Sequence, residues 1–182
     1  MMCSAIKAIT GLHANHAANL ARERCRAAGY LSANTLGYDI SGTLSPSTAE
    51  GDNSVLLSKT ASEYLRFYCK SLRDSKAFAK HYAKMFGRSM SFGFLGCADL
   101  ESLDSLHKVL ENHEFSTALQ LRMKMSKADK KEYFETLVFK EQHLVQELGR
   151  AYGERLISMA ARNAIAHADR EIQPILTKLH HM

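Results

Sequence analysis

The chain has 182 residues, of which 46% are hydrophobic and 24% charged, with only two prolines and a formal net charge of +5. This composition is typical of a folded globular protein and excludes fibrous and intrinsically disordered classes. The length suffices for one hydrophobic core, so we expect residues 1–182 to form a single domain without a membrane span or a secretory signal.

The first predicted element is an amphipathic helix over residues 4–28. Ile6, Ile9 and Leu20 recur at helical spacing, and Gly29 ends the pattern. Residues 29–54 then become rich in Gly, Ser, Thr and Asn. Such a stretch predicts one long, flexible Ser/Gly-rich loop.

The middle of the chain predicts several helices. Residues 55–73 carry an apolar stripe, and a continuation of this helix is expected to stop at Gly87. Residues 89–97 are predicted to form a turn or short extended link. Asp99 then caps a leucine-rich helix, and a short separate helix is predicted over residues 116–123.

The longest predicted helix begins at Ser126 and continues to about Arg170, with one bend allowed. Gly149 and Gly153 interrupt its apolar stripe and permit either that bend or a close helix contact. Residues 175–182 are predicted to be a frayed tail. Because strand-type alternation is scarce, the predicted fold class is all-α, a single-domain bundle of four to five main helices.

The cysteine and histidine patterns give no support for a metal or cofactor site. His13 and His16 share one helix face, but neither a carboxylate nor a third histidine lies near them, so no metal is predicted. Phosphate-binding glycine loops are absent from the sequence, so no cofactor is predicted either. The cysteines are widely spaced without a CxxC pair, so neither a zinc site nor a redox motif is predicted. Three of the four lie in stretches patterned as helix, where a small buried thiol is expected, and this indicates a reducing, cytoplasmic compartment. The cysteines are Cys3, Cys25, Cys69 and Cys97.

Positive charge is concentrated between Arg66 and Arg88, where seven basic residues accompany one acid. A stripe of this kind is typical of a polyanion-binding face, although a solvated surface is the common alternative. The candidate nucleic-acid-binding residues are Arg66, Lys70, Arg73, Lys80 and Lys84.

Arg162, Asn163 and His167 form an R-N-x-x-x-H motif in the last predicted helix. Histidine transfers protons near neutral pH, and a guanidinium group binds phosphate oxygens. The three side chains therefore suit metal-free cleavage of RNA, in which the ribose 2′-hydroxyl attacks the adjacent phosphate. The alternative interpretation is that they cap the end of the helix and bind its last carbonyl groups.

This motif, its late position and the all-helical architecture resemble the HEPN superfamily, whose ribonuclease members carry Arg and His at a similar spacing. The resemblance implies a metal-independent RNA endonuclease with Arg162, Asn163 and His167 as catalytic residues. It also implies RNA as the partner, a homodimer with two motifs in one cleft, and a role as a toxin or defence factor.

Two other functions stay open. A non-enzymatic helical interaction protein would bind a protein partner through its Met-containing apolar stripes. Examples are an adaptor, a viral structural factor, or a secreted effector that acts in the host cytosol. A basic helical module would instead bind nucleic acid without catalysis, through the stripe at residues 66–88.

Overall fold

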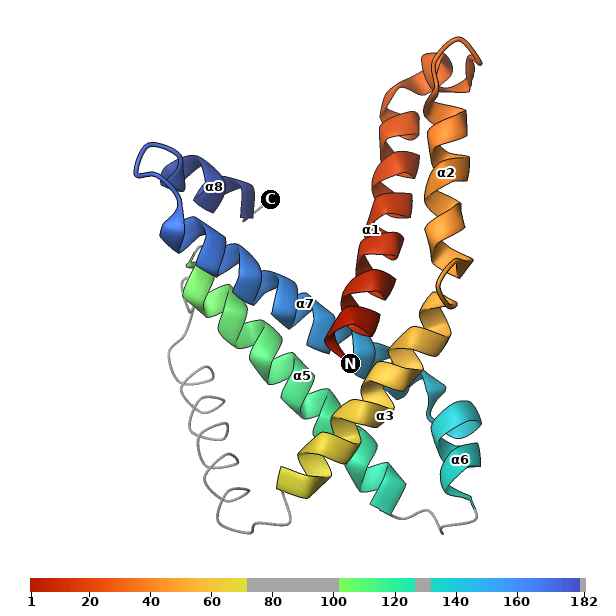
Figure 1. Ribbon diagram of the computed structural model, residues 1–182, viewed down its shortest axis with the longest axis vertical. Coiled ribbons are helices and arrows are strands. Elements are labelled where there is room, and N and C mark those ends of the chain that lie inside the picture. The colour runs from red at the N-terminus through yellow and green to blue at the C-terminus, as the bar shows by residue number, and fades with distance from the viewer. Residues whose placement is uncertain (72–101, 127–131, 181–182) are drawn as a thin grey trace.

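The computed structural model describes residues 1–71, 102–126 and 132–180 (Figure 1). Every regular element in these ranges is helical, so the predicted all-α fold class is confirmed. The main helices are α1 (Met2–Arg24), α2 (Leu36–Thr48), α3 (Asn53–Ser71), α5 (Leu103–Ser126) and α7 (Gln142–His167). The shorter elements are the 3₁₀-helix η1 (Arg26–Tyr30), α6 (Tyr133–Glu135), the π-helical turn η2 (Thr136–Lys140) and α8 (Gln173–His180).

The main helices form two antiparallel pairs that meet at α3 (Figure 1). One pair is the α1–α2 hairpin, and the other consists of α5 and α7. α3 contacts both pairs, because it packs against α1 on one side and α7 on the other. The N-terminus lies at this junction, whereas the C-terminal α8 folds back at the far end of α7.

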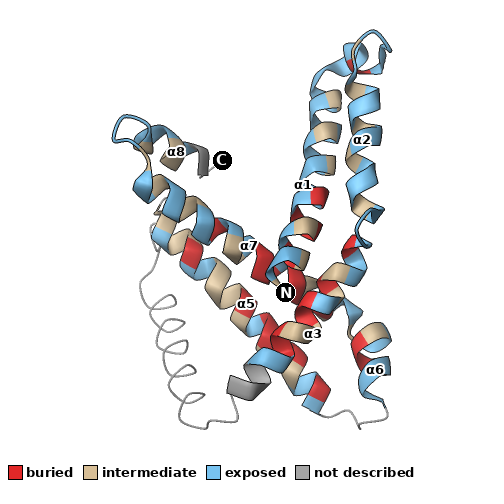
Figure 2. Ribbon diagram, in the orientation of Figure 1, coloured by how far each residue is buried: buried red, intermediate tan, exposed pale blue. Residues whose placement is uncertain are grey.

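The hydrophobic core lies where α3 crosses α5 and α7, and buried residues gather at that crossing (Figure 2). Apolar stripes on these helices create it, because burial of apolar side chains is the main stabilising term. The largest fully buried side chains are Leu57, Thr60, Leu121, Val145 and Leu148.

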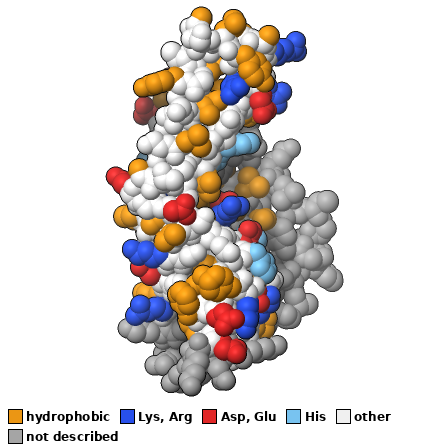
Figure 3. Space-filling view, turned by 90° about the vertical axis from the view of Figure 1, so that its right-hand side faces the viewer, with side chains coloured by type: hydrophobic (Ala, Val, Ile, Leu, Met, Phe, Trp, Pro, Cys, Tyr) orange, Lys and Arg blue, Asp and Glu red, His pale blue; other side chains and the backbone are white. Residues whose placement is uncertain are grey.

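The α1–α2 hairpin has almost no core of its own. α1 buries four residues, all between Ala5 and Gly11, and α2 buries none. On the face shown in Figure 3, apolar side chains are interspersed with charged groups. Tyr38 and Leu44 of α2 are 82% and 51% exposed. The hairpin therefore depends on its attachment at the α3 junction for its position.

Two glycines allow α7 to cross its neighbours closely. A Cβ atom added to Gly149 would lie 2.9 Å from the carbonyl oxygen of Leu57 and 3.0 Å from its Cβ. A Cβ atom added to Gly153 would overlap the side chain of Ile9. The close helix contact that these glycines predicted is thus present, with α3 at Gly149 and with α1 at Gly153.

The loop predicted over residues 29–54 is wrong for most of its length. Residues 36–48 form α2, although Gly, Ser and Pro are poor helix formers. Packing of α2 along α1 overrides that weak propensity, and Pro46 lies near the end of the helix. The tail predicted to be frayed is likewise helical, since α8 reaches His180.

The single long helix predicted from Ser126 is also wrong. α5 continues to Ser126, so the separate short helix predicted over 116–123 is part of it. α7 begins only at Gln142, because η2 ends at Lys140 and the backbone of the next residue, Glu141 (φ −117°, ψ 24°), is not helical. The helices predicted over 4–28 and 55–73 correspond to α1 and α3, whereas the link at 89–97 lies outside the described residues.

The prediction that the cysteines are buried is wrong for the two whose side chains the structure describes. Cys3 and Cys25 are exposed and carry free thiols. Cys97 and the side chain of Cys69 lie outside the described part of the chain. Among the helices that the structure describes, none is both long and apolar enough to span a bilayer.

We expect Gly149→Ala to lower the free energy of unfolding by about 1–3 kcal/mol, because the added methyl group meets the backbone of α3. Gly42→Ala is the matched control, since a Cβ atom at this α2 position has no neighbour within 4 Å. It should raise the free energy of unfolding by roughly 0.5–1 kcal/mol. Chemical denaturation measures both values, and equal effects would contradict the close crossing of α7 and α3.

Candidate functional site

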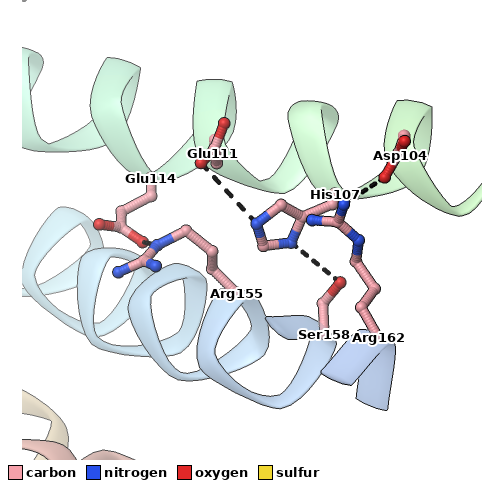
Figure 4. A network of polar contacts seen from close by, with 7 residues as sticks. All are labelled: Asp104, His107, Glu111, Glu114, Arg155, Ser158 and Arg162. Carbon is pink, nitrogen blue, oxygen red and sulfur yellow. Dashed lines mark hydrogen bonds and ion pairs between the residues drawn. The ribbon is translucent and has the colours of Figure 1, made fainter. Parts of the chain in front are cut away.

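The three residues predicted as catalytic do not converge on one site. Arg162 extends from α7 toward α5 and forms an ion pair with Asp104 (Figure 4). His167 is the last residue of α7, and its Nδ1–H donates to the carbonyl oxygen of Asn163 at 2.7 Å. Asn163 and His167 are both exposed. These contacts are an interhelical ion pair and a bond to one of the last helical carbonyl groups.

Helical geometry explains why Arg162 and His167 diverge. Five residues apart, their side chains leave the helix axis in directions that differ by about 140°. The long side chain of Arg162 could have reached back toward His167, but Asp104 holds it against α5. The assignment of these residues to catalysis stays a prediction.

The predicted nucleic-acid-binding set lies mostly beyond the described residues. Arg66 is exposed on α3, and Lys70 belongs to the same helix but its side chain is not described. Arg73, Lys80 and Lys84 lie outside the described ranges.

The two histidines considered for a metal site lie on the surface. His13 and His16 are both exposed on α1. Within the described ranges, no group of three His, Cys, Asp or Glu side chains could hold a metal ion.

A buried ion pair joins α5 and α7. Glu114 of α5 is 6% exposed and accepts hydrogen bonds from the Tyr64 hydroxyl at 2.8 Å and from Nε of Arg155. The Arg155 guanidinium also lies 5.5 Å from the centroid of the Tyr152 ring. Burial opposes the charge on Arg155, but its hydrogen bond and attraction to Glu114 prevail and raise its pKa. The pair is thus compensated, which a buried charge requires.

His107 forms a second buried contact between the same helices (Figure 4). Its Nδ1 lies 3.1 Å from Oγ of Ser158, and its Nε2 lies 3.7 Å from the carboxylate of Glu111. Serine, histidine and carboxylate in this order are the components of a nucleophilic triad. Ser158, however, is only 4% exposed, so a substrate has no access to its hydroxyl group. We therefore treat this contact as part of the packing.

A different polar group occupies the turn between α2 and α3. Glu50 (φ 60°) and Gly51 (φ 105°) both have left-handed backbone conformations. This conformation is unfavourable for glutamate by roughly 1–2 kcal/mol, whereas glycine tolerates it. Among the described residues, Arg26 is the other non-glycine residue with a positive φ. Such strain persists only where the surrounding structure imposes it, and it occurs frequently at functional sites.

Contacts with α1 and with the first turn of α3 hold this turn in place. Nζ of Lys7, from α1, donates to the carbonyl oxygen of Gly51 at 2.6 Å and to Oδ1 of Asn53 at 3.0 Å. The carboxylate of Asp52 accepts the first free backbone N–H groups of α3 and so caps that helix. Glu50 is therefore the acidic residue of the turn that is left to the solvent.

The acidic side chains within α2 and α3, the helices on either side of the turn, are already engaged. Asp39 accepts a hydrogen bond from Thr35 at 3.2 Å, and Glu63 forms an ion pair with the amino group of Met1 at 2.8 Å. Glu50 forms no hydrogen bond or ion pair with the described residues, and its backbone is strained. Glu50 is therefore our candidate for a chemically active group. Sequence reasoning missed it because the stretch E-G-D-N was interpreted as part of a flexible loop.

Comparison with protein families gives a match over residues 1–65. These residues match the model of the acyl-CoA oxidase C-alpha1 domain. The matched stretch includes α1, α2, most of α3 and the turn that carries Glu50. Neither the curated proteins nor the solved structures include a match to the chain.

This match contradicts the resemblance to the HEPN superfamily. It points to a different family, and the ribonuclease, toxin and defence functions are therefore wrong. The predictions of an RNA partner and of a homodimer rested on that resemblance, so nothing now supports them. The six-residue motif wrongly suggested a ribonuclease because arginine and histidine also have structural roles in helical proteins. Here Arg162 pairs with a carboxylate of the neighbouring helix, and His167 binds a carbonyl oxygen at the end of its own helix.

We expect Arg155→Leu to lower the free energy of unfolding by roughly 3 kcal/mol, because Glu114 would stay buried without its cation. Arg162→Leu is the matched control on the same helix. Its partner Asp104 is 66% exposed, so the loss should be about 0–1 kcal/mol. Chemical denaturation of both variants checks the difference. Losses of equal size would show that burial does not distinguish the two pairs.

The pH dependence of stability should report on His107. Burial lowers its pKa, the charges of Arg162 and Arg155 act in the same direction, and Glu111 and Asp104 oppose them. The unfolded chain therefore binds this proton more readily than the folded one. The free energy of unfolding should fall as the pH drops below the ordinary value of 6.5 toward the lowered pKa. Urea titrations across this pH range measure the free energy of unfolding, which should fall less steeply as the pH drops in His107→Gln than in the wild type. An equally steep fall in the variant would show that His107 does not cause the pH dependence.

Proposed function

We propose that the chain takes part in the oxidation of acyl-CoA thioesters, with the α2–α3 turn at the reacting end of the substrate. The match of residues 1–65 to the acyl-CoA oxidase C-alpha1 domain supports this function. The strained Glu50 turn within that matched stretch supports the location.

The chemistry of such an oxidation requires a base. Two hydrogens leave the acyl chain, one as a proton from the carbon next to the thioester carbonyl and one as a hydride from the neighbouring carbon. The first is acidic because the carbonyl group shares the charge that remains. A carboxylate within hydrogen-bonding reach of that carbon can accept the proton. We assign this role to the Glu50 carboxylate.

A redox cofactor supplies the hydride acceptor in reactions of this kind. The described residues identify no binding place for one. What this chain contributes under our proposal is the base and the turn that holds it. Oxygen as the final electron acceptor, which the word oxidase denotes, would then be reduced by two electrons for each acyl-CoA consumed.

Burial favours Glu50 over the polar residues of α5 and α7 as the base. Glu114 is 6% exposed and fully engaged by Tyr64 and Arg155, and His107 is 7% exposed. Neither can meet a substrate without separation of the two helices. Glu50 is exposed and has no competing partner among the described residues.

Glu50→Gln tests the assignment, because glutamine keeps the shape of the side chain and removes its basicity. In protein purified with its bound redox cofactor, we expect acyl-CoA-dependent oxygen consumption to fall by about 10²–10⁴-fold. The far-UV circular dichroism spectrum and the unfolding midpoint should not change. Glu23→Gln, at an exposed acidic position of α1 in the same matched stretch, is the control and should keep full activity.

Two results would count against the proposal. Full activity of Glu50→Gln would show that this carboxylate is not the base. Wild-type protein that neither binds nor oxidises acyl-CoA would remove the function itself, whatever the effect of the substitution.

A further inference from the structure

We infer that Lys7 is the positioning residue that holds the Glu50–Gly51 turn in its left-handed conformation; this inference rests on the proposed function of Glu50. Lys7 lies in the second turn of α1, more than forty positions before the residues it contacts. It belongs to a different helix from either side of the turn, so it can fix the turn from outside.

The backbone on both sides of Glu50 is held in place. On one side, the N–H group of Ala49 donates to the carbonyl oxygen of Ser45 at 2.9 Å and completes the end of α2. On the other, the ammonium group of Lys7 holds the carbonyl oxygen of Gly51 at 2.6 Å. The chain must change direction between these two fixed points, from α2 into α3, within about two residues (Figure 1). A left-handed backbone at Glu50 and Gly51 achieves that change of direction.

The second contact of Lys7 explains an otherwise unfavourable feature. An ammonium group only donates hydrogen bonds, so Asn53 must turn its amide oxygen toward Lys7. Its amide nitrogen then faces the interior near Gly11, where a Cβ atom would lie 3.4 Å away. Asn53 is 6% exposed, and this nitrogen has no hydrogen-bond partner among the residues that the structure describes.

A buried amide donor without an acceptor is unfavourable and rare in folded proteins. The hydrogen bond from the Lys7 ammonium group to Oδ1 of Asn53 is charge-assisted and therefore strong, so it offsets the unfavourable burial of the amide nitrogen. The ammonium group of Lys7 thus binds two oxygen atoms at once, Oδ1 of Asn53 and the carbonyl oxygen of Gly51. Lys7, Asn53 and Gly51 therefore form one unit whose effect is to fix the residue next to them, Glu50.

The test compares Lys7→Met, which removes the donor, with Lys7→Arg, which keeps one. We expect Lys7→Met to lower kcat for acyl-CoA oxidation by about 10²-fold with little change in KM, the size of effect that a misplaced reacting group produces. Lys7→Arg should recover most of that loss. Lys108→Met, at an exposed position of α5, is the matched control and should leave kcat unchanged.

Amide hydrogen exchange gives a readout that does not depend on activity. Lys7→Met should accelerate exchange at residues 50–55, whereas the amides of α5 and α7 should keep their protection. Unchanged exchange at the turn in Lys7→Met, with full kcat, would overturn the inference while leaving the role of Glu50 intact. Accelerated exchange throughout the chain in both Lys7 variants would also overturn it, because the lysine would then support the whole fold.

The proposed function can fail separately from this inference. If Glu50→Gln keeps its activity, the base is elsewhere and kcat no longer reports on the turn. Exchange at residues 50–55 in Lys7→Met then decides by itself whether Lys7 fixes the turn.

Discussion

The missing side chains of Gly149 and Gly153 set the distance at which α7 crosses α3 and α1. Leu57 and Ile9 occupy the space that a Cβ atom would need at these two positions. The crossing brings the first turns of α1 beside the start of α3, and the contact between Lys7 and the α2–α3 turn depends on that placement. It also brings Tyr64 of α3 within reach of Glu114 on α5. The ion pair between α5 and α7 and the contact of Lys7 with the α2–α3 turn thus depend on the same helix crossing.

These two polar features differ in how they are stabilised. Between α5 and α7, buried charges are matched with opposite charges and hydroxyl groups, which is the arrangement of a structural contact. At the α2–α3 turn, a strained backbone, an exposed carboxylate and an unpaired buried amide lie within four residues. Departures from local preference of this kind are concentrated where a fold serves function rather than stability.

The sequence predicted the elements whose residues follow a helical stripe. α1 and α3 were located well, because their apolar residues recur with the helical period. α2 was missed because its Gly, Ser and Pro content predicts a loop, and only contact with α1 makes it helical. The candidate site could not be found this way. It depends on the φ angle of Glu50 and on Lys7 contacts across more than forty positions.

The absence of any buried residue in α2 has a consequence for how this chain can diverge in evolution. Substitutions on the outer face of α2 should change the free energy of unfolding very little, because no side chain of this helix packs in the core. Mutations can then accumulate along this helix faster than in α3 or α7, whose side chains fill the core. Sequence drift would therefore be greatest immediately before the turn that carries Glu50. A family of such chains would keep the turn recognisable long after the helix leading into it had lost all similarity.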